Sequence, residues 1–424
     1  MQKVIIIGSG HAAAQLAPSL RKQGWKGEIL IIGDEAYIPY QRPPLSKEFM
    51  VGKKTDDEIL IRPLSAYGQH DISFKLNETV VKLNPLENTL TLSTGESIGY
   101  DRLALCTGAR TRKIPIPGSE LEGVFYLRTI DDVKGIKHTL DAGIKGRAKK
   151  SVNTGDSANV VIVGGGYIGL ETAAALRKIG VHVTILEMQD RVLARVTAPE
   201  VSEFYQRVHA EEGVQIHIDS IVSHIEGEGQ VSVVHCKSGE RFDADLVIIG
   251  VGVVPNVELA EEAGLLVDNG IVVDEFGQTS VSNIFAAGDC TSHPNALLAD
   301  SLTNGRLRLE SVPNAMEQAK TVAASICGQS LPYASYPWFW SDQYDLKLQI
   351  AGLSQGFDQV VIRGDHKNSR SFVAWYLKQG KLLAADCVNR PKEFLVAKKL
   401  LSRGDIVDPD KLVDESIDPK TFLQ

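Results

Sequence analysis

Two glycine-rich segments, far apart in the chain, have the spacing that lets a backbone turn hold a phosphate. They are Gly8-Ser9-Gly10-His11-Ala12-Ala13 and Gly164-Gly165-Gly166-Tyr167-Ile168-Gly169. The first glycine allows the sharp turn, the second lets a pyrophosphate approach the backbone, and the third position needs only a small side chain, which Ala13 provides. The helix that follows offers unpaired N–H groups to the phosphates. The sequence therefore predicts two dinucleotide-binding turns.

An acidic residue follows each turn, near the place where a ribose would lie. Glu187 closes the apolar run after the second helical stretch, where a carboxylate accepts a hydrogen bond from a ribose 2′-OH and repels a 2′-phosphate. Asp34 has the corresponding place in the first copy, and it comes later because Lys26-Gly27-Glu28 lengthens the turn. Glu187 favours NADH over NADPH, although Arg191 nearby keeps NADPH as an alternative.

A third turn, late in the chain, adds a carboxylate of another kind. The segment Ile284-Phe285-Ala286-Ala287-Gly288-Asp289 predicts a strand ending in a Gly-Asp turn, where Asp289 suits the polyol chain of a flavin. Two fingerprints predict two dinucleotides, and NADH needs a redox partner beside it. FAD is the common dinucleotide that meets this need, so we expect FAD at the first turn and NADH at the second.

The elements that position these turns repeat along the chain. The run from Val4 to Gly10 recurs from Val160 to Gly166, and Leu20-Arg21-Lys22 recurs as Leu176-Arg177-Lys178 at the same distance. Each copy has an apolar run, a glycine turn, a helical stretch and a second apolar run, which is a βαβ pattern with a parallel sheet. Beyond residue 330, aromatic-rich alternating strands and a helix over Pro391 to Leu401 predict a small α+β domain.

Two proline-bearing crossings, near Ile114 to Gly118 and near Pro255, divide the chain. We predict an α/β protein with two Rossmann-like domains and a C-terminal α+β domain. The FAD-binding domain is discontinuous, over 1–117 and 254–330, the NAD-binding domain covers 118–253, and the C-terminal reductase domain covers 331–424. The polar segment from Lys145 to Ser157 predicts an exposed loop.

Composition excludes several classes of protein. The 45 basic and 53 acidic residues give a net charge of -8, which argues against nucleic acid as a partner. No apolar stretch approaches the roughly 18 to 20 residues that cross a bilayer, and the run from Val4 to Ile7 lacks the features of a signal peptide, so we expect no membrane partner and a cytoplasmic location. The five cysteines form no CxxC pair, which predicts buried reduced thiols, no metal site and no redox disulfide.

Longer strings resemble the NADH-dependent ferredoxin reductases of oxygenase electron-transfer systems, and the resemblance covers nearly the whole chain. Outside the second glycine segment and the Gly-Asp turn, these strings are Tyr40-Gln41-Arg42-Pro43-Pro44-Leu45-Ser46-Lys47, Tyr126-Leu127-Arg128-Thr129, Glu310-Ser311-Val312-Pro313-Asn314-Ala315 and Trp338-Phe339-Trp340-Ser341-Asp342-Gln343-Tyr344. The resemblance implies an oxidoreductase with a glutathione-reductase-like fold that binds two dinucleotides.

Residue by residue, the resemblance implies two ligand sets and a catalytic pair. The FAD set is Gly8, Gly10, Ala12, Asp34, Arg42, Lys47, Val80, Arg128, Asp289 and Val312. The NADH set is Gly164, Gly166, Ile168, Gly169, Glu187 and Gly252. Lys47 would lie beside the flavin N5 and pair with Glu171, where a cation favours the reduced flavin; the alternative for Lys47 is a solvated lysine. Tyr167 and Trp340 would flank the nicotinamide, with plain packing as their alternative.

The expected reaction moves a hydride from NADH to FAD and then single electrons to a [2Fe-2S] ferredoxin that serves an oxygenase. The Pro43 to Lys47 segment has no cysteine, which excludes a dithiol relay. An acidic ferredoxin would need a local basic face, for which the candidates are Arg306, Arg308, Lys392, Lys398 and Lys399. Two alternatives remain open. One is a reductase of rubredoxin or of a quinone-like small molecule, and the other is an apoptosis-inducing-factor-like protein whose function is redox-controlled binding.

Overall fold

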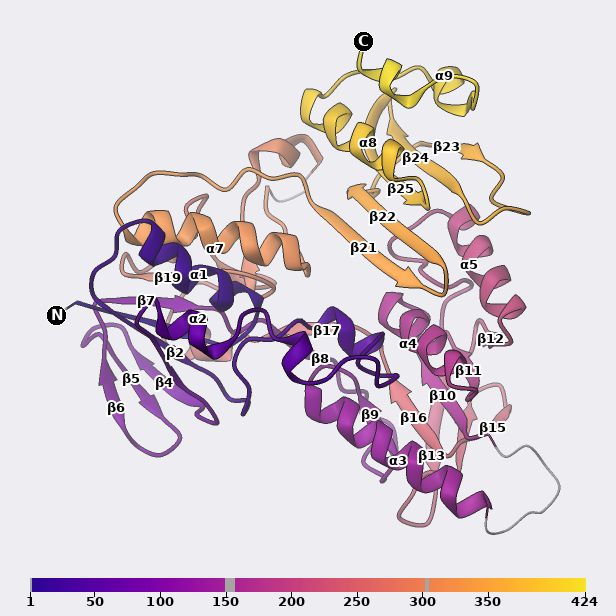
Figure 1. Ribbon diagram of the computed structural model, residues 1–424, viewed down its shortest axis with the longest axis horizontal. Helices are drawn as coiled ribbons and strands as arrows, with labels where there is room; N and C mark the ends of the chain where they lie inside the picture. The colour runs from indigo at the N-terminus through magenta and orange to yellow at the C-terminus, as the bar shows by residue number, and fades with distance from the viewer. Residues whose placement is uncertain (1, 149–156, 302–304) are drawn as a thin grey trace. The chain divides into compact units, whose positions relative to one another are not determined.

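The two βαβ fingerprints lie in different units of the computed structural model, which describes residues 2–148, 157–301 and 305–424 (Figure 1). Contacts within the chain divide it into two units, each assembled from three segments. Unit 1 consists of Met1–Gln41, Asp57–Arg110 and Val254–Phe339. Unit 2 consists of Arg42–Asp56, Thr111–Val253 and Trp340–Gln424.

Unit 1 contains a five-stranded parallel sheet with the strand order β19-β7-β1-β2-β3. Its central strand β1 (Lys3–Ile7) is buried on both faces, which explains the continuous apolar run. Val4 and Ile6 pack against the helices α1 (His11–Lys22) and α7 (Val312–Ile326), which lie side by side in Figure 1. Ile5 and Ile7 pack against the antiparallel sheet β4-β5-β6.

The remaining elements of unit 1 are short. Its strands are β2 (Glu28–Ile32), β3 (Ile72–Lys75), β4 (Val80–Asn84), β5 (Thr89–Leu92), β6 (Ser97–Gly99), β7 (Arg102–Leu105), β18 (Ile271–Val272), β19 (Ile284–Ala286) and β20 (Thr291–Ser292). Its helices are η2 (Asp57–Ile59), α2 (Leu64–Gly68), α6 (Glu258–Glu262) and η3 (Ala296–Ser301). Two of the crossings between the units lie within β8 (Ala109–Thr111) and β17 (Val253–Pro255).

Unit 2 repeats the parallel sheet with the order β12-β11-β10-β16-β9, so β10, β11 and β12 correspond to β1, β2 and β3. Val161 and Val163 of the central strand pack against an antiparallel sheet, β13-β14-β15, as their counterparts do in unit 1. The strands are β9 (Val124–Tyr126), β10 (Asn159–Val163), β11 (His182–Leu186), β12 (Gln215–His217), β13 (Val222–Glu226), β14 (Val233–Cys236), β15 (Arg241–Asp243) and β16 (Leu246–Ile249). The helices are η1 (Pro43–Ser46), α3 (Ile130–Ala148), α4 (Tyr167–Lys178) and α5 (Pro199–Glu211).

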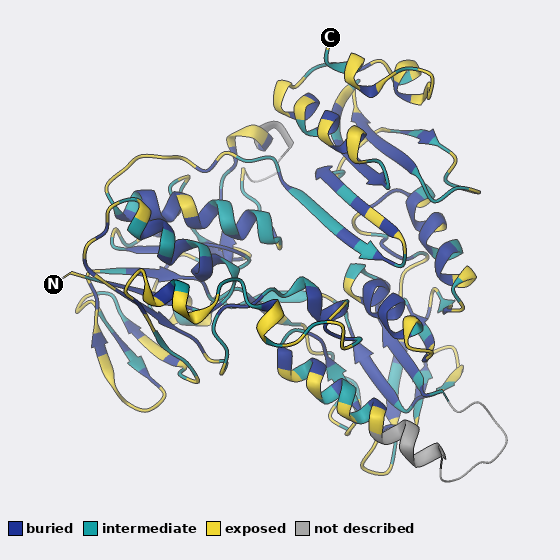
Figure 2. Ribbon diagram, viewed as in Figure 1, coloured by how far each residue is buried: buried dark blue, intermediate teal, exposed yellow. Residues whose placement is uncertain are grey.

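The C-terminal part of unit 2 is an antiparallel sheet with the order β21-β22-β25-β24-β23, and the helix α8 packs on it. Its elements are β21 (Trp338–Gln343), β22 (Leu346–Gly352), β23 (Gln359–Gly364), β24 (Phe372–Lys378), β25 (Lys381–Val388), α8 (Pro391–Arg403), α9 (Pro409–Val413) and η4 (Pro419–Leu423). β24 is buried over most of its length (Figure 2). The sheet joins the second fingerprint region because the Phe372 ring packs on Phe204, with ring centroids 4.8 Å apart, and Tyr376 accepts a hydrogen bond from the Ala198 N–H at 3.1 Å.

The parallel sheets and the C-terminal α+β part confirm the predicted fold class. The predicted loop is wrong at its start, because α3 continues to Ala148 through Lys145 and Arg147, which are good helix formers. The rest of that prediction, residues 149–156, lies outside the described residues. The three-domain division is finer than the two units and stays a prediction. No helix in the described parts of the chain is both long and apolar enough to span a membrane.

Candidate active site

The first glycine turn has the shape that a pyrophosphate requires. Gly8 has a φ of +105°, and a Cβ there would lie 2.2 Å from the Cys106 carbonyl oxygen, so glycine is required. Gly10 is the N-cap of α1, and a Cβ on it would meet no atom within 4 Å in the described part of the chain. Gly10 directly precedes the first turn of α1, and the N–H groups of a first turn have no partner within their own helix. These residues fit an anionic ligand.

The second turn repeats this geometry in unit 2. Gly164 has a φ of +110°, and a Cβ there would lie 2.5 Å from the Gly250 carbonyl oxygen. Gly166 is the N-cap of α4, and among the described residues its Cβ would again meet nothing within 4 Å. The third glycine has a packing role, since a Cβ on Gly169 would lie 2.2 Å from the Gly164 carbonyl oxygen.

Within unit 1 the structure brings several predicted FAD residues together. A Cβ on Gly288, beside Asp289, would lie 3.4 Å from Ala12 Cβ and 3.6 Å from Ala315 Cβ, so the Gly-Asp turn packs against α1 and the first turns of α7. Val312 is the first residue of α7. Asp34 is exposed just after β2. Val80, the first residue of β4, is buried in the hydrophobic core. Their contact with a cofactor stays a prediction.

Within unit 2, Arg42 and Arg128 lie together, because the Arg42 guanidinium donates to the Arg128 carbonyl oxygen at 2.7 Å. Ile168 is 42% exposed at the start of α4, as a ligand-contacting side chain should be. Gly252 is exposed beyond the end of β16, and Trp340 is half-buried on β21.

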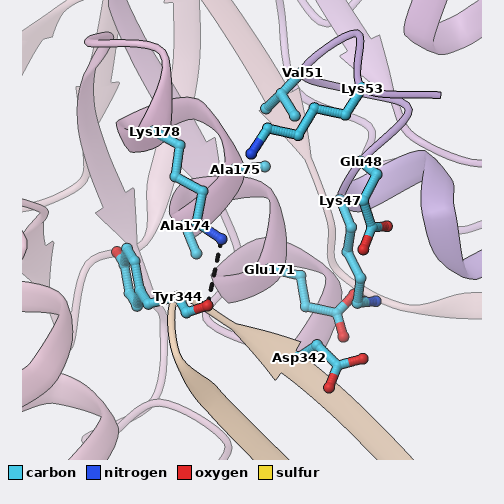
Figure 3. Close-up of a pocket in the computed structure, with 10 residues that line it drawn as sticks. All are labelled: Lys47, Glu48, Val51, Lys53, Glu171, Ala174, Ala175, Lys178, Asp342 and Tyr344. Atoms are coloured by element: carbon cyan, nitrogen blue, oxygen red, sulfur yellow. Dashed lines mark hydrogen bonds and ion pairs between the residues drawn. The ribbon is translucent and has the colours of Figure 1, made fainter.

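Lys47 and Glu171 form a well-buried ion pair. Lys47 Nζ lies 2.5 Å from Glu171 Oε2, and the two side chains are only 11% and 7% exposed. Lys47 follows η1, and Glu171 projects from the second turn of α4, so the pairing joins segments far apart in sequence. In Figure 3 the end of the Lys47 side chain lies against the Glu171 carboxylate. The solvated-lysine alternative for Lys47 is therefore wrong.

Sequence reasoning missed two serines that hold this carboxylate. Ser46 Oγ donates to Glu171 Oε2 at 2.6 Å, and Ser341 Oγ donates to Glu171 Oε1 at 2.7 Å. Both serines lie inside strings that carry the family resemblance, but a serine hydroxyl has no pattern that signals its partner. Lys47 Nζ also approaches the Pro43 carbonyl oxygen at 3.3 Å. Among the described residues, the Lys47 ammonium therefore has two acceptors, Glu171 Oε2 and the Pro43 carbonyl oxygen. One of its three N–H groups is left for a ligand.

The Glu187 carboxylate is held by backbone N–H groups, one of them from the second glycine turn. Glu187 Oε2 accepts from the Gly165 N–H at 2.6 Å, and Oε1 accepts from the Gln189 N–H at 2.8 Å. A carboxylate has about four lone-pair sites, so both oxygens can still accept a ribose hydroxyl. Arg191 donates instead to the carbonyl oxygens of Thr197 and Ala194 and to a serine hydroxyl, so its guanidinium is committed to the protein.

Burial keeps Tyr167 and the cysteines in their protonated forms. The Tyr167 hydroxyl is buried, without a hydrogen-bond partner among the described residues, and burial, reinforced by the Asp386 carboxylate, raises the pKa of Tyr167 well above its usual value. All five cysteines are free, and burial raises the pKa of each thiol. Thiolate chemistry therefore has no support in this structure.

The two arginines of the basic-face hypothesis have partners within the protein, which weakens that hypothesis. Arg306 donates to two backbone carbonyl oxygens of unit 1, and Arg308 forms an ion pair with Glu310 at 2.5 Å. Neither guanidinium is a fully exposed cation. Lys392 and Lys399 are exposed on α8, so the hypothesis narrows to the lysines of that helix.

Comparisons with known proteins agree with this geometry. The family model described as pyridine nucleotide-disulphide oxidoreductase matches residues 2–319, and the model described as reductase C-terminal matches 338–423. Putidaredoxin reductase CamA of Pseudomonas putida is 41% identical, over 99% of this chain and 96% of the relative. A rubredoxin-NAD(+) reductase of Pseudomonas putida is 38% identical, over 92% of this chain and 96% of the relative. The solved covalent putidaredoxin reductase-putidaredoxin complex matches with a TM-score of 0.91 and 40% identity, over 100% of this chain and 98% of that one.

These similarities confirm the resemblance to ferredoxin reductases and the predicted enzyme class. They also confirm the cofactor class, FAD with a pyridine nucleotide, to which the two glycine turns point. The chain belongs to the pyridine nucleotide-disulphide oxidoreductase family, and it carries that family's two-dinucleotide fold followed by a reductase C-terminal domain.

Proposed function

We propose that this protein transfers electrons from NADH, through FAD, one at a time to a [2Fe-2S] ferredoxin that serves an oxygenase. The observation that carries the proposal is the pair of open glycine turns, one at α1 and one at α4, in a chain without a dithiol. When bound, FAD would supply the step from paired to single electrons, because a hydride donor gives two and an iron–sulfur cluster accepts one.

We assign the cofactors to the residues of the two turns and their neighbours. FAD would be held by Gly8, Gly10, Ala12, Asp34, Arg42, Lys47, Val80, Arg128, Asp289 and Val312, and Trp340 would flank the nicotinamide. NADH would be held by Gly164, Gly166, Ile168, Gly169, Glu187 and Gly252. The helix N-termini favour the phosphates through their unpaired N–H groups and their positive dipole ends.

Lys47 and Glu171 are the residues that we assign to catalysis. The Lys47 ammonium would supply positive charge at the reactive edge of the flavin, through the N–H that the described residues leave open. Glu171 fixes the direction of that ammonium, and the serines on both of its oxygens fix Glu171. Preorganised charge of this kind is a large contribution to catalysis in a buried site.

We infer that NADH is preferred to NADPH. Glu187 stands where a 2′-phosphate would meet a negative charge. Arg191, the cation that supported NADPH, has its guanidinium bonded to the protein backbone and to Ser202. We also propose a cytoplasmic location, which suits five unpaired cysteines, and docking of the ferredoxin at the exposed lysines of α8.

Anaerobic reduction tests the proposal. The purified protein should be yellow, NADH should bleach it, and cytochrome c reduction should rise at least about tenfold when a [2Fe-2S] ferredoxin of an oxygenase system is added. Lys392→Glu with Lys399→Glu should weaken the ferredoxin-dependent rate at low salt. A colourless protein that FAD does not reconstitute, or a pigment that NADH leaves unbleached, would contradict the proposal.

Rubredoxin is the second candidate acceptor, because one full-length relative is named a rubredoxin-NAD(+) reductase. The NADH half of the reaction would be unchanged, so only the acceptor distinguishes the two. Turnover with equal concentrations of ferredoxin and rubredoxin decides between them. An apoptosis-inducing-factor-like binding function would instead show slow turnover with both acceptors.

A further inference from the structure

A chain of hydrogen-bonded side chains leads from the half-buried Tyr344 to the ion pair of Lys47 and Glu171. Its bonds are Tyr344 Oη to His209 Nδ1 at 3.0 Å, His209 Nε2 to Gln343 Oε1 at 2.8 Å, Gln343 Nε2 to Ser341 Oγ at 3.1 Å and Ser341 Oγ to Glu171 Oε1 at 2.7 Å. We call Tyr344, His209, Gln343 and Ser341 the polar chain. Every member lies in unit 2.

The strand β21 places two members of the polar chain on one face. Ser341 and Gln343 are two residues apart, so they point the same way, and both are about 1% exposed. Asp342, between them, points to the other face and lines the pocket around Lys47 in Figure 3. His209, on α5, is 0% exposed and closes the gap between Gln343 and Tyr344.

The carboxylate at the end fixes the direction of every bond in the polar chain. An ionised Glu171 can only accept, so the Ser341 hydroxyl must donate to it and accept from the next residue. Gln343 therefore presents its NH₂ to Ser341 and its carbonyl oxygen to His209. His209 must then donate from Nε2, which leaves Nδ1 to accept from the Tyr344 hydroxyl.

One further observation agrees with this direction, and another describes how Tyr344 meets His209. Burial lowers the pKa of His209 to about 4, so the ring is neutral and holds one proton, as the chain requires. Tyr344 has a φ of +54° in the two-residue connection between β21 and β22, where hairpin turns take positive φ, and its ring lies edge-on to His209 with the centroids 5.0 Å apart.

We propose that the polar chain is a positioning device for Lys47: its aligned donors hold Glu171 in one orientation, and Glu171 holds the ammonium. The inference rests on the proposed function, because it assigns a purpose to the ion pair. Aligned hydrogen bonds polarise one another, so the whole chain adds donor strength at Ser341. Because amide transfer of a proton is slow, the Gln343 link makes the chain a support and excludes a proton relay.

The test compares single-atom deletions along the polar chain in the FAD-loaded protein. Anaerobic stopped-flow reduction gives the limiting rate and the apparent Kd for NADH, and a dye-coupled titration gives the flavin midpoint potential. Ser341→Ala should lower the limiting rate about tenfold, with the Kd within about twofold, because it removes one charged hydrogen bond. The potential should become more negative, because a looser cation stabilises the reduced flavin less. Tyr344→Phe, at the far end, should lower the rate by about two- to threefold.

The controls separate positioning from general loosening. Ser341→Thr keeps the hydroxyl and suits a strand, so it should restore the rate. Tyr376→Phe removes a buried hydroxyl that donates to Asp386 and accepts from the Ala198 N–H, both outside the polar chain, and should leave rate and potential unchanged. The inference is wrong if the Ser341 and Tyr344 variants match the native rate and potential, or if Tyr376→Phe slows reduction equally. If Ser341→Ala does not fold, the reduction rates and midpoint potentials of Tyr344→Phe and Gln343→Met test the inference in its place. Failure of NADH to bleach the native protein would contradict the proposed function instead.

Discussion

The two nucleotide-binding units have the same strand order and the same backbone turn, but at two neighbouring positions glycine and the larger residue change places. In unit 2 the residue after the second strand is Glu187, and the middle of the turn is Gly165. In unit 1 the corresponding residues are Gly33 and Ser9. The backbone bond beside them is the same, from Gly8 N to Ile32 O at 2.7 Å and from Gly164 N to Leu186 O at 2.8 Å.

In each unit only one of the two positions has room for a side chain. A Cβ on Gly165 would lie 3.2 Å from Glu187 Oε2 and 2.9 Å from Val192 Cγ1, so the carboxylate can reach the Gly165 N–H only because that residue has no side chain. A Cβ on Gly33 would lie 2.6 Å from Ser9 Oγ, so in unit 1 the serine takes the space. Unit 1 therefore has to carry its acid one residue later, at Asp34. One backbone shape thus presents two different carboxylate positions.

The largest expected effect comes from the third position of each turn. Gly169→Ala places a Cβ 2.2 Å from the Gly164 carbonyl oxygen, and neither backbone can move without breaking the strand contact. We expect a loss of about 3 kcal/mol in unfolding free energy and of NADH binding. Its counterpart, Ala13→Gly, should cost only about 1 kcal/mol, from helix propensity. Urea unfolding measures both, and equal costs would contradict the packing role of Gly169.

The second effect concerns the two acids. Glu187→Ala should lower kcat/KM for NADH about tenfold relative to NADPH, because it removes a ribose acceptor and a charge that repels the 2′-phosphate. Asp34→Ala should leave the NADH/NADPH ratio unchanged and weaken FAD retention. Steady-state kinetics with both nucleotides, and the flavin content after gel filtration, measure the outcomes. An unchanged ratio in Glu187→Ala would remove the ribose assignment.

The smallest effect tests the exchange itself. Gly33→Ala alone should cost about 1 kcal/mol, because its Cβ meets the Ser9 side chain. In a Ser9→Gly background the same substitution should cost less, because the space is then open. A double-mutant cycle by urea unfolding gives the coupling energy. Additive costs would show that the two positions do not share this space.

Much of the fold was predictable because it rests on short-range pattern. The apolar runs before each glycine triplet and the helical repeats predicted two parallel βαβ units, and both form. Asp34 comes three residues later after its glycine turn than Glu187 does after the second turn, and the longer turn before β2 explains only part of this difference. β2 begins four residues after Gly24, and β11 begins two residues after Gly180, so the turn accounts for two residues and the Gly33 exchange for the third.

The candidate site was less predictable where it depends on side chains that meet across the fold. The pairing of Lys47 with Glu171 came from a family resemblance, and its two serines and the polar chain beyond them had no sequence signal. Arg191 looked available for a phosphate, but both of its terminal nitrogens donate to the protein, to the carbonyl oxygens of Thr197 and Ala194 and to the Ser202 hydroxyl. The arginines expected on a docking face also have partners within the protein.

The sequence by itself determined where the backbone turns lie, because glycine adopts a positive φ without a steric cost and an apolar run before each glycine triplet predicts the strand. It also determined that no cysteine pair stands in the segment before Lys47. Only the tertiary structure decided which charges are paired and which hydroxyls support them. Those bonds join residues more than a hundred positions apart, and their geometry follows from packing that no local pattern encodes.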